Sequence, residues 1–99
     1  MSDDGTEQEN RRRVYDDGTL AKVRILTVPK SDTYSEGFKY SFHYTVIGAD
    51  DPVVRFDNHH GAHELHLSAR TYEFDFPGLT VVKACWVAAL PAAKRDDWR

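Results

Sequence analysis

Two stretches of the chain alternate strictly between apolar and polar residues, which is the pattern of a half-buried β-strand. The first lies between Gly18 and Pro29, with apolar residues at positions 21, 23 and 25 and basic residues at 22 and 24. The second runs from Phe38 to Ile47. Because successive side chains of a strand point to opposite faces, it predicts one large buried face, formed by Phe38, Tyr40, Phe42, Tyr44 and Val46.

Two shorter strands are predicted further along the chain. The turn-forming residues 48–51 lead into a third strand over residues 52–57, and residues 70–76 alternate again and predict a fourth. The polar residues 58–67 between them are expected to form a loop.

The third strand has consequences for the polar face of the sheet. Val54 and Phe56 share one parity, so they are expected to face the same core as the aromatic side of the second strand. The hairpin then brings His43 opposite or near Arg55 and Asp57 on the other face. The sequence therefore predicts an imidazole, a guanidinium and a carboxylate close together.

Apolar spacings of three and four predict a helix near the C-terminus. They run through residues 79–90, and Pro91 ends or kinks the helix. Asp75 is expected to cap its start, with Pro77 in the first turn. Cys85, the single cysteine, lies within this helix and is interpreted as a small core residue.

Together these elements predict an α+β fold, an antiparallel meander of about four strands with one C-terminal helix packed on one face. A chain of 99 residues has material for one core, so we expect a single domain over residues 14–95. Residues 1–13 contain no large apolar residue after the initiator and predict a flexible N-terminal tail. Residues 96–99 are taken as a C-terminal tail, whose Trp98 either contacts a partner or packs back on the domain.

The charge and the apolar content narrow the classes of function. A net charge of −3 argues against nucleic-acid binding through a uniformly basic surface. Residues 18–90, however, hold eight acids against seven bases, so a local positive patch is compatible with the composition. No apolar run approaches the roughly 20 residues that span a bilayer, and the N-terminus has no signal-peptide pattern. We expect a cytoplasmic protein without a membrane partner.

Histidines are concentrated in the segment Arg55–His66, which reads RFDNHHGAHELH. Four of the five histidines of the chain lie within eight of its positions. Candidate catalytic residues are Arg55, Asp57, His60, His63 and His66 together with His43, and candidate substrate contacts are Lys39, Ser41, Asn58 and His59.

Three interpretations of this cluster stay open. Two histidines can act as general acid and base near neutral pH, and Arg55 would then steady the phosphorane of an RNA cleavage that needs no metal. The cluster can instead bind one divalent ion, most simply zinc, through His60, His63, His66 and Glu64. It can also be structural, with solvated or capping imidazoles.

The order of segments FKYSFHY, RFDNHHGAHELH and YEFDFPGL, followed by an amphipathic helix with Trp86 near its middle, resembles the TumE family of small toxins. The resemblance covers about residues 18–90. It implies a growth-inhibiting toxin of a toxin–antitoxin pair, neutralised by a cognate antitoxin that is usually a helix-turn-helix protein. The matching positions are Arg55, Asp57, Asn58, His60, His63 and His66. The chain departs from the family pattern in having Glu64 inside the cluster.

Two classes of function follow. The first is a small ribonuclease with RNA as substrate, metal-independent rather than metal-dependent and without a cofactor. The second is a non-enzymatic metal-binding or protein-interaction domain built on the same histidines. Self-association is compatible with either.

Overall fold

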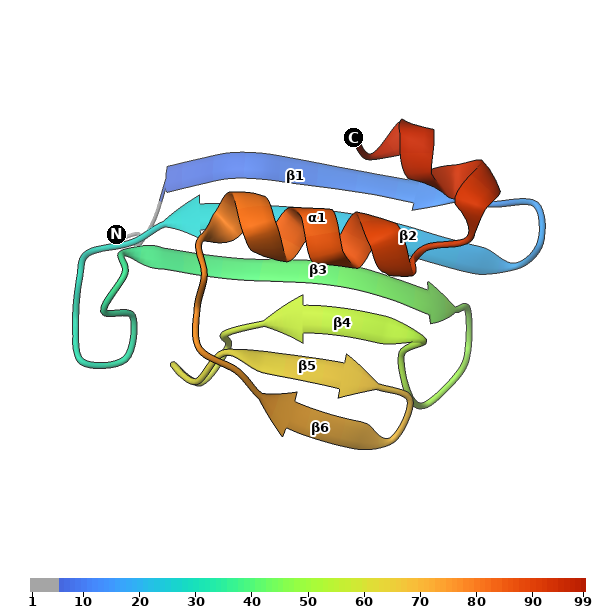
Figure 1. Cartoon of the computed structure of the whole chain (residues 1–99). Helices are drawn as coiled ribbons and strands as arrows, with labels where there is room; N and C mark the ends of the chain where they lie inside the picture. The colour runs from blue at the N-terminus through green and yellow to red at the C-terminus, as the bar shows by residue number, and fades with distance from the viewer. Residues whose placement is uncertain (1–5) are drawn as a thin grey trace.

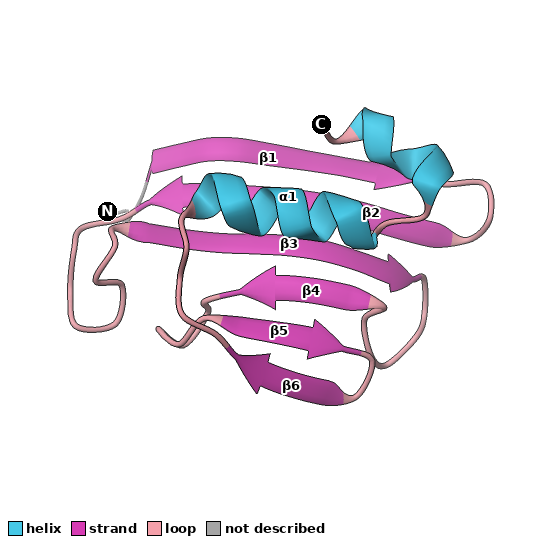
Figure 2. Cartoon of the chain, in the orientation of Figure 1, coloured by secondary structure: helices cyan, strands magenta, loops and turns pink. Residues whose placement is uncertain are grey.

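The computed structural model describes residues 6–99. Six strands form one antiparallel sheet in which neighbours in sequence are neighbours in space, and one helix lies across a face of it (Figure 1). This confirms the predicted α+β meander, with six strands where about four were expected. The elements are β1 (Thr6–Val14), β2 (Thr19–Thr27), β3 (Phe38–Val46), β4 (Val54–Asp57), β5 (Glu64–Leu67), β6 (Arg70–Glu73), α1 (Leu79–Ala89) and the 3-10 helix η1 (Ala92–Asp97) (Figure 2).

The core lies between the sheet and α1, and the aromatic face of β3 is its centre. Tyr40, Phe42 and Tyr44 all point to this side and are buried. Trp86 of α1 is fully buried against them, with its ring centroid 5.8 Å from that of Phe42. Burying large aromatic side chains is the main apolar gain available to a chain of this size, so this contact decides which face of the sheet is covered.

The two additional strands arise where the sequence predicts a tail and a loop. Residues 6–13 belong to the predicted tail but form β1, whereas residues 1–5 lie outside the described residues. β1 contributes almost no apolar burial; it is held by backbone pairing with β2 and by the guanidinium of Arg11, 4.6 Å from the ring centre of Trp98. β5 is formed by the last four residues of the predicted loop, and its alternation is too short to be detected from sequence.

The start of the helix and the exposure of Cys85 differ from what the sequence predicts. Its N-cap is Gly78, whose φ of 106° favours glycine, and no side chain caps it, so the expected capping role of Asp75 is wrong. Val82 and Trp86 form the buried stripe of α1, which places Cys85 on the outer side. Cys85 is therefore exposed and is not the core residue that the sequence predicts. Neither helix in residues 6–99 is long and apolar enough to cross a membrane.

The C-terminal segment packs back on the domain. η1 extends into the predicted tail as far as Asp97, and Trp98 is buried edge-on against Trp86, with its indole N–H donating to Tyr15. Next to it, the buried Lys94 donates hydrogen bonds to three oxygens, which belong to Asp17, Thr19 and Tyr44. These contacts tie the end of the chain to β2 and β3.

Replacing Lys94 with methionine should lower the free energy of unfolding by about 1–3 kcal/mol, because the hydroxyls of Thr19 and Tyr44 lose a buried donor. Urea unfolding followed by circular dichroism measures the change. Lys30→Met, at an exposed loop position, is the matched control and should stay within about 0.5 kcal/mol of the unmodified chain. Equal stability of the two variants would contradict the role given to Lys94.

Candidate functional site

The face of the sheet turned away from α1 is polar, and basic residues form a row across it. Both helices of residues 6–99 lie on the opposite face (Figure 1). Adjacent strands are about 4.8 Å apart, so residues at one register position are direct neighbours. The register confirms the predicted pairing of His43 with Arg55. The complete row runs from β1 to β6 through Arg12, Lys22, His43, Arg55, His66 and Thr71.

A pocket of about 240 Å³ opens on this polar face. Three cationic side chains, two imidazoles and one hydroxyl line it, and no carboxylate of residues 6–99 is among the lining groups. It is therefore a local positive site on a chain whose net charge is −3. The lining residues are Lys22, Arg24, Ser41, His43, Arg55 and His59.

Both imidazoles of the pocket have a lowered pKa. Burial lowers the pKa of His43 below the ordinary 6.5, and the positive charges of Arg55 and Lys22 lower it further. His59 is exposed, but desolvation by the surrounding protein lowers its pKa as well; the carboxylate of Asp57 opposes the shift and Arg55 adds to it. Both rings are therefore largely neutral at pH 7 and can accept a proton.

Asp57 anchors one side of the pocket. Its side chain is only 3% exposed, and its Oδ2 lies 2.7 Å from Nε of Arg55. The two atoms are at ion-pair distance without the alignment of a hydrogen bond, so the contact is electrostatic. Oδ1 of Asp57 accepts the backbone N–H of His59 at 3.4 Å. One buried carboxylate thus positions the guanidinium and the start of the loop that carries His59.

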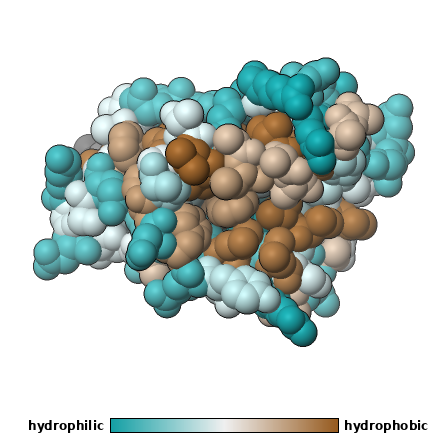
Figure 3. Space-filling view, in the orientation of Figure 1, coloured by the Kyte–Doolittle hydropathy of each residue, from teal (hydrophilic) through white to brown (hydrophobic). Residues whose placement is uncertain are grey.

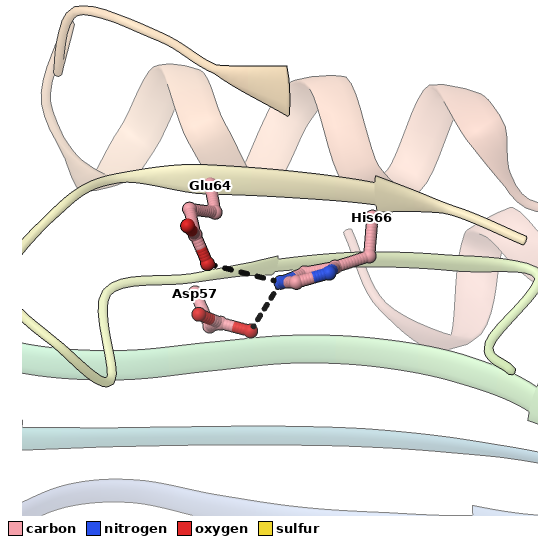
Figure 4. Close-up of side chains that lie close together, drawn as sticks. All are labelled: Asp57, Glu64 and His66. Carbon is pink, nitrogen blue, oxygen red and sulfur yellow. Dashed lines mark ion pairs between the residues drawn. The ribbon is translucent and has the colours of Figure 1, made fainter. Parts of the chain in front are cut away.

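On the other side of Asp57, a second group forms with Glu64 and His66 (Figure 4). Nε2 of His66 lies 3.3 Å from Asp57 Oδ2 and 3.4 Å from Glu64 Oε1. Its Nδ1 lies 3.1 Å from the hydroxyl of Thr71. Nδ1 of His66 is therefore within hydrogen-bond distance of a hydroxyl, whereas Nε2 is buried at ion-pair distance from two carboxylates and makes no hydrogen bond within residues 6–99.

His63 lies on the opposite, core-facing side of the sheet. Its ring stacks on Phe76 with centroids 4.4 Å apart. Nδ1 lies 2.9 Å from the hydroxyl of Tyr40 and Nε2 lies 3.2 Å from Glu36 Oε1. The expected grouping of His60, His63 and His66 is therefore wrong. His63 directly precedes β5, and the side-chain period of an extended chain is two, so positions 63 and 66 point to opposite faces.

The remaining predicted site residues have different places. Asn58 is buried, accepts the N–H of Tyr40 at 2.9 Å and donates to the carbonyl of Phe38 at 2.8 Å, so it is a structural clamp on β3 and not a free substrate contact. His60 is exposed. Lys39 lies beside the pocket, with Nζ 5.9 Å from the ring centre of Tyr34.

A protein-family model described as Toxin TumE matches residues 1–86. The chain belongs to the TumE toxin family. No curated protein and no solved structure matches the chain. Membership confirms the resemblance carried by the histidine-rich segment. It makes the chain the toxin component of a toxin–antitoxin module, with a cognate antitoxin as its partner.

In this TumE toxin, two residues of the pocket were missed by reasoning from sequence. Lys22 and Arg24 occupy the polar positions of the first alternation, far from the histidines along the chain. The register of β2 and β3 pairs them with His43 and Ser41. The sequence does indicate that Lys22 and Arg24 lie on the polar face of their strand. Only the order of the strands in the sheet places that face beside the pocket.

Asn58→Ala should lower the free energy of unfolding of this TumE toxin by about 1–3 kcal/mol for each buried backbone group that it leaves unpaired on β3. Thermal and urea unfolding measure the loss. His60→Ala, two positions along the same loop but exposed, is the control and should change stability by less than about 0.5 kcal/mol. A neutral Asn58→Ala variant would show that the amide is not a clamp.

Proposed function

We propose that this TumE toxin cleaves RNA without a metal ion, in the pocket that joins His43 and His59 on the polar face. One observation carries the proposal: two imidazoles and three cationic side chains surround the same 240 Å³ of space. Cleavage beside a 2′-hydroxyl needs a base, an acid and positive charge around the phosphate. The pocket offers all three.

The reaction follows from these groups. One imidazole takes the proton of the 2′-hydroxyl while O2′ attacks phosphorus. The other gives a proton to O5′ as the P–O5′ bond breaks, leaving a 2′,3′-cyclic phosphate and a 5′-hydroxyl. The lowered pKa of both rings keeps the basic form abundant at neutral pH. The acid form is then the scarcer one.

The cations of the pocket would bind the phosphate and stabilise the charge that grows on it. Arg55 is the best placed, because Asp57 fixes its guanidinium from below the pocket. Lys22 adds charge from β2, and so does Arg24, although its Nε also lies 3.3 Å from Glu7 Oε2 of β1. In this account Asp57 is a positioning residue, and His60 and His63 take no part in the chemistry.

A second candidate is a metal centre formed by Asp57, Glu64 and His66. One ligand atom of each lies within 4.8 Å of the others, and two carboxylates with one imidazole suit zinc or another divalent ion. This set replaces the expected ligands His60 and His63. The guanidinium of Arg55 already sits 2.7 Å from Asp57 Oδ2 and would repel a second cation there. We therefore favour the metal-independent reaction.

The antitoxin of this toxin is proposed, on the family resemblance, to be a helix-turn-helix protein. Its docking place is a separate question from the chemistry of the pocket.

Alanine at His43 or at His59 should each lower kcat/KM for cleavage of a mixed-sequence oligoribonucleotide about 10²–10⁴-fold, because each removes one proton-transfer group. His60→Ala is the matched control from the same loop and should retain activity. Thermal unfolding confirms that the variants fold.

The same assay separates the two candidates. Unchanged cleavage in a chelator, with full activity of Glu64→Gln, is expected for metal-independent chemistry. Loss of cleavage in both conditions would instead support the metal centre. Full activity of the His43 and His59 variants would refute the proposed site.

The pH dependence provides an independent test. The reaction needs one protonated and one neutral imidazole, and both pKa values lie below the ordinary 6.5, so kcat/KM should be bell-shaped, peak on the acid side of 6.5 and fall as pH rises. Lys22→Gln removes a charge that lowers the pKa of His43 and should move the alkaline limb to higher pH. Lys30→Gln should leave it in place. A profile that rises through pH 8 would contradict this assignment.

A further inference from the structure

Helix α1 is apolar on its outer side as well as on its inner side. Of its eleven residues, only Thr80 and Lys83 are polar. A surface helix normally presents charged residues to solvent, and one that is apolar all round is usually covered. Figure 3 shows the apolar surface gathered over this side of the molecule. The exposed stripe consists of Val81, Ala84, Cys85 and Ala88, at spacings of three, one and three.

Beside this stripe, a groove of about 380 Å³ runs between α1 and η1. Its floor is apolar and formed by Ala84, Val87, Ala88 and Trp98. Its rim is cationic, with Lys83 on the helix and Arg95 and Arg99 at the end of the chain. Within residues 6–99, no carboxylate lines the groove.

We propose that this groove, together with the adjoining exposed stripe of α1, is the place where the cognate antitoxin docks, through an amphipathic segment that carries apolar residues on one side and acidic residues on the other. The proposal rests on family membership, which provides the antitoxin, and does not depend on RNA cleavage. An apolar floor binds apolar side chains, and the cationic rim selects carboxylates over ammonium or guanidinium groups.

The contacts of the two arginines at the rim support an acidic partner. Nε of Arg95 donates a hydrogen bond to the carbonyl of Leu90, and the rest of its guanidinium is left at the rim of the groove. Arg99 is paired with Asp96, but both side chains are well exposed, so this pair contributes little and can rearrange. The rim therefore keeps a net positive charge that a partner can neutralise.

The groove and the basic pocket lie on opposite sides of the sheet, so antitoxin docking and blocking of the pocket take place at different surfaces. α1 covers the core-facing side of the sheet, whereas the basic pocket opens on the other side. A segment bound along α1 anchors the antitoxin without entering the pocket. Blocking the pocket then requires another part of the antitoxin to reach around the sheet.

The single cysteine makes the test direct, because Cys85 is exposed in the middle of the stripe and no label needs to be introduced. The rate of Cys85 alkylation by a maleimide is measured on the full chain alone and with saturating purified cognate antitoxin. We expect the antitoxin to slow alkylation by about tenfold or more. An unchanged rate in the saturated complex would overturn the proposal, and so would equal protection produced by raising the concentration of the toxin alone, which would assign the stripe to a second copy.

Charge reversal tests the chemistry of the occupant. Lys83→Glu should weaken antitoxin binding, measured by isothermal titration calorimetry, by about tenfold, and added salt should weaken the unmodified complex. Arg70→Glu, an equal charge reversal on the exposed β6, is the matched control and should bind normally. Lys83→Glu should cleave RNA like the unmodified chain, whereas Lys22→Glu should impair cleavage, so failure of the docking surface and failure of the nuclease site are distinguishable. Normal binding by Lys83→Glu would refute the acidic segment.

Discussion

The burial of the aromatic face of β3 under α1 is the constraint on which the rest of the structure depends. Tyr40, Phe42 and Tyr44 are committed to the core, and the strand period of two then commits their neighbours to the other face. His43 lies half-buried on that face because Phe42 and Tyr44 point into the core. The register carries the same division into β2 and β4, so Lys22 and Arg55 become its neighbours. The basic pocket is thus a consequence of core packing.

A buried carboxylate organises the polar side in turn. The cost of desolvating the Asp57 carboxylate is offset by the guanidinium of Arg55 on one side and by the backbone N–H of His59 on the other. It is shared with His66, which joins the two halves of the face (Figure 4). The result is an electrostatic division: cations of β2 and β4 line the pocket, whereas the carboxylates of Asp57, at the end of β4, and Glu64, on β5, lie outside its lining. This division explains how an acidic chain can hold a site for an anion.

Much of the fold could be predicted, because alternation in residues 38–47 and helical spacing in residues 79–90 are strong local signals. β1 could not, since backbone pairing rather than apolar burial holds it. The site was predicted where parity decided it, as for His43 and Arg55. The prediction of the site was wrong where sequence spacing was used without knowing the secondary structure. Intervals of three suggested that His60, His63 and His66 converge, whereas the extended backbone places His63 on the core-facing side of the sheet. The position of Lys22 beside His43 could not be predicted, because it depends on the register between β2 and β3.

The central claim is that the reactive histidines are those of the pocket and not the histidine-rich segment as a whole. The most direct test is NMR of the five imidazoles while an uncleavable 2′-O-methyl oligoribonucleotide is added. We predict saturable shifts of the His43 and His59 ring signals, with His63 unchanged on the opposite face. Shifts centred on His63, or no shift at His43 and His59 when RNA is bound, would contradict the account.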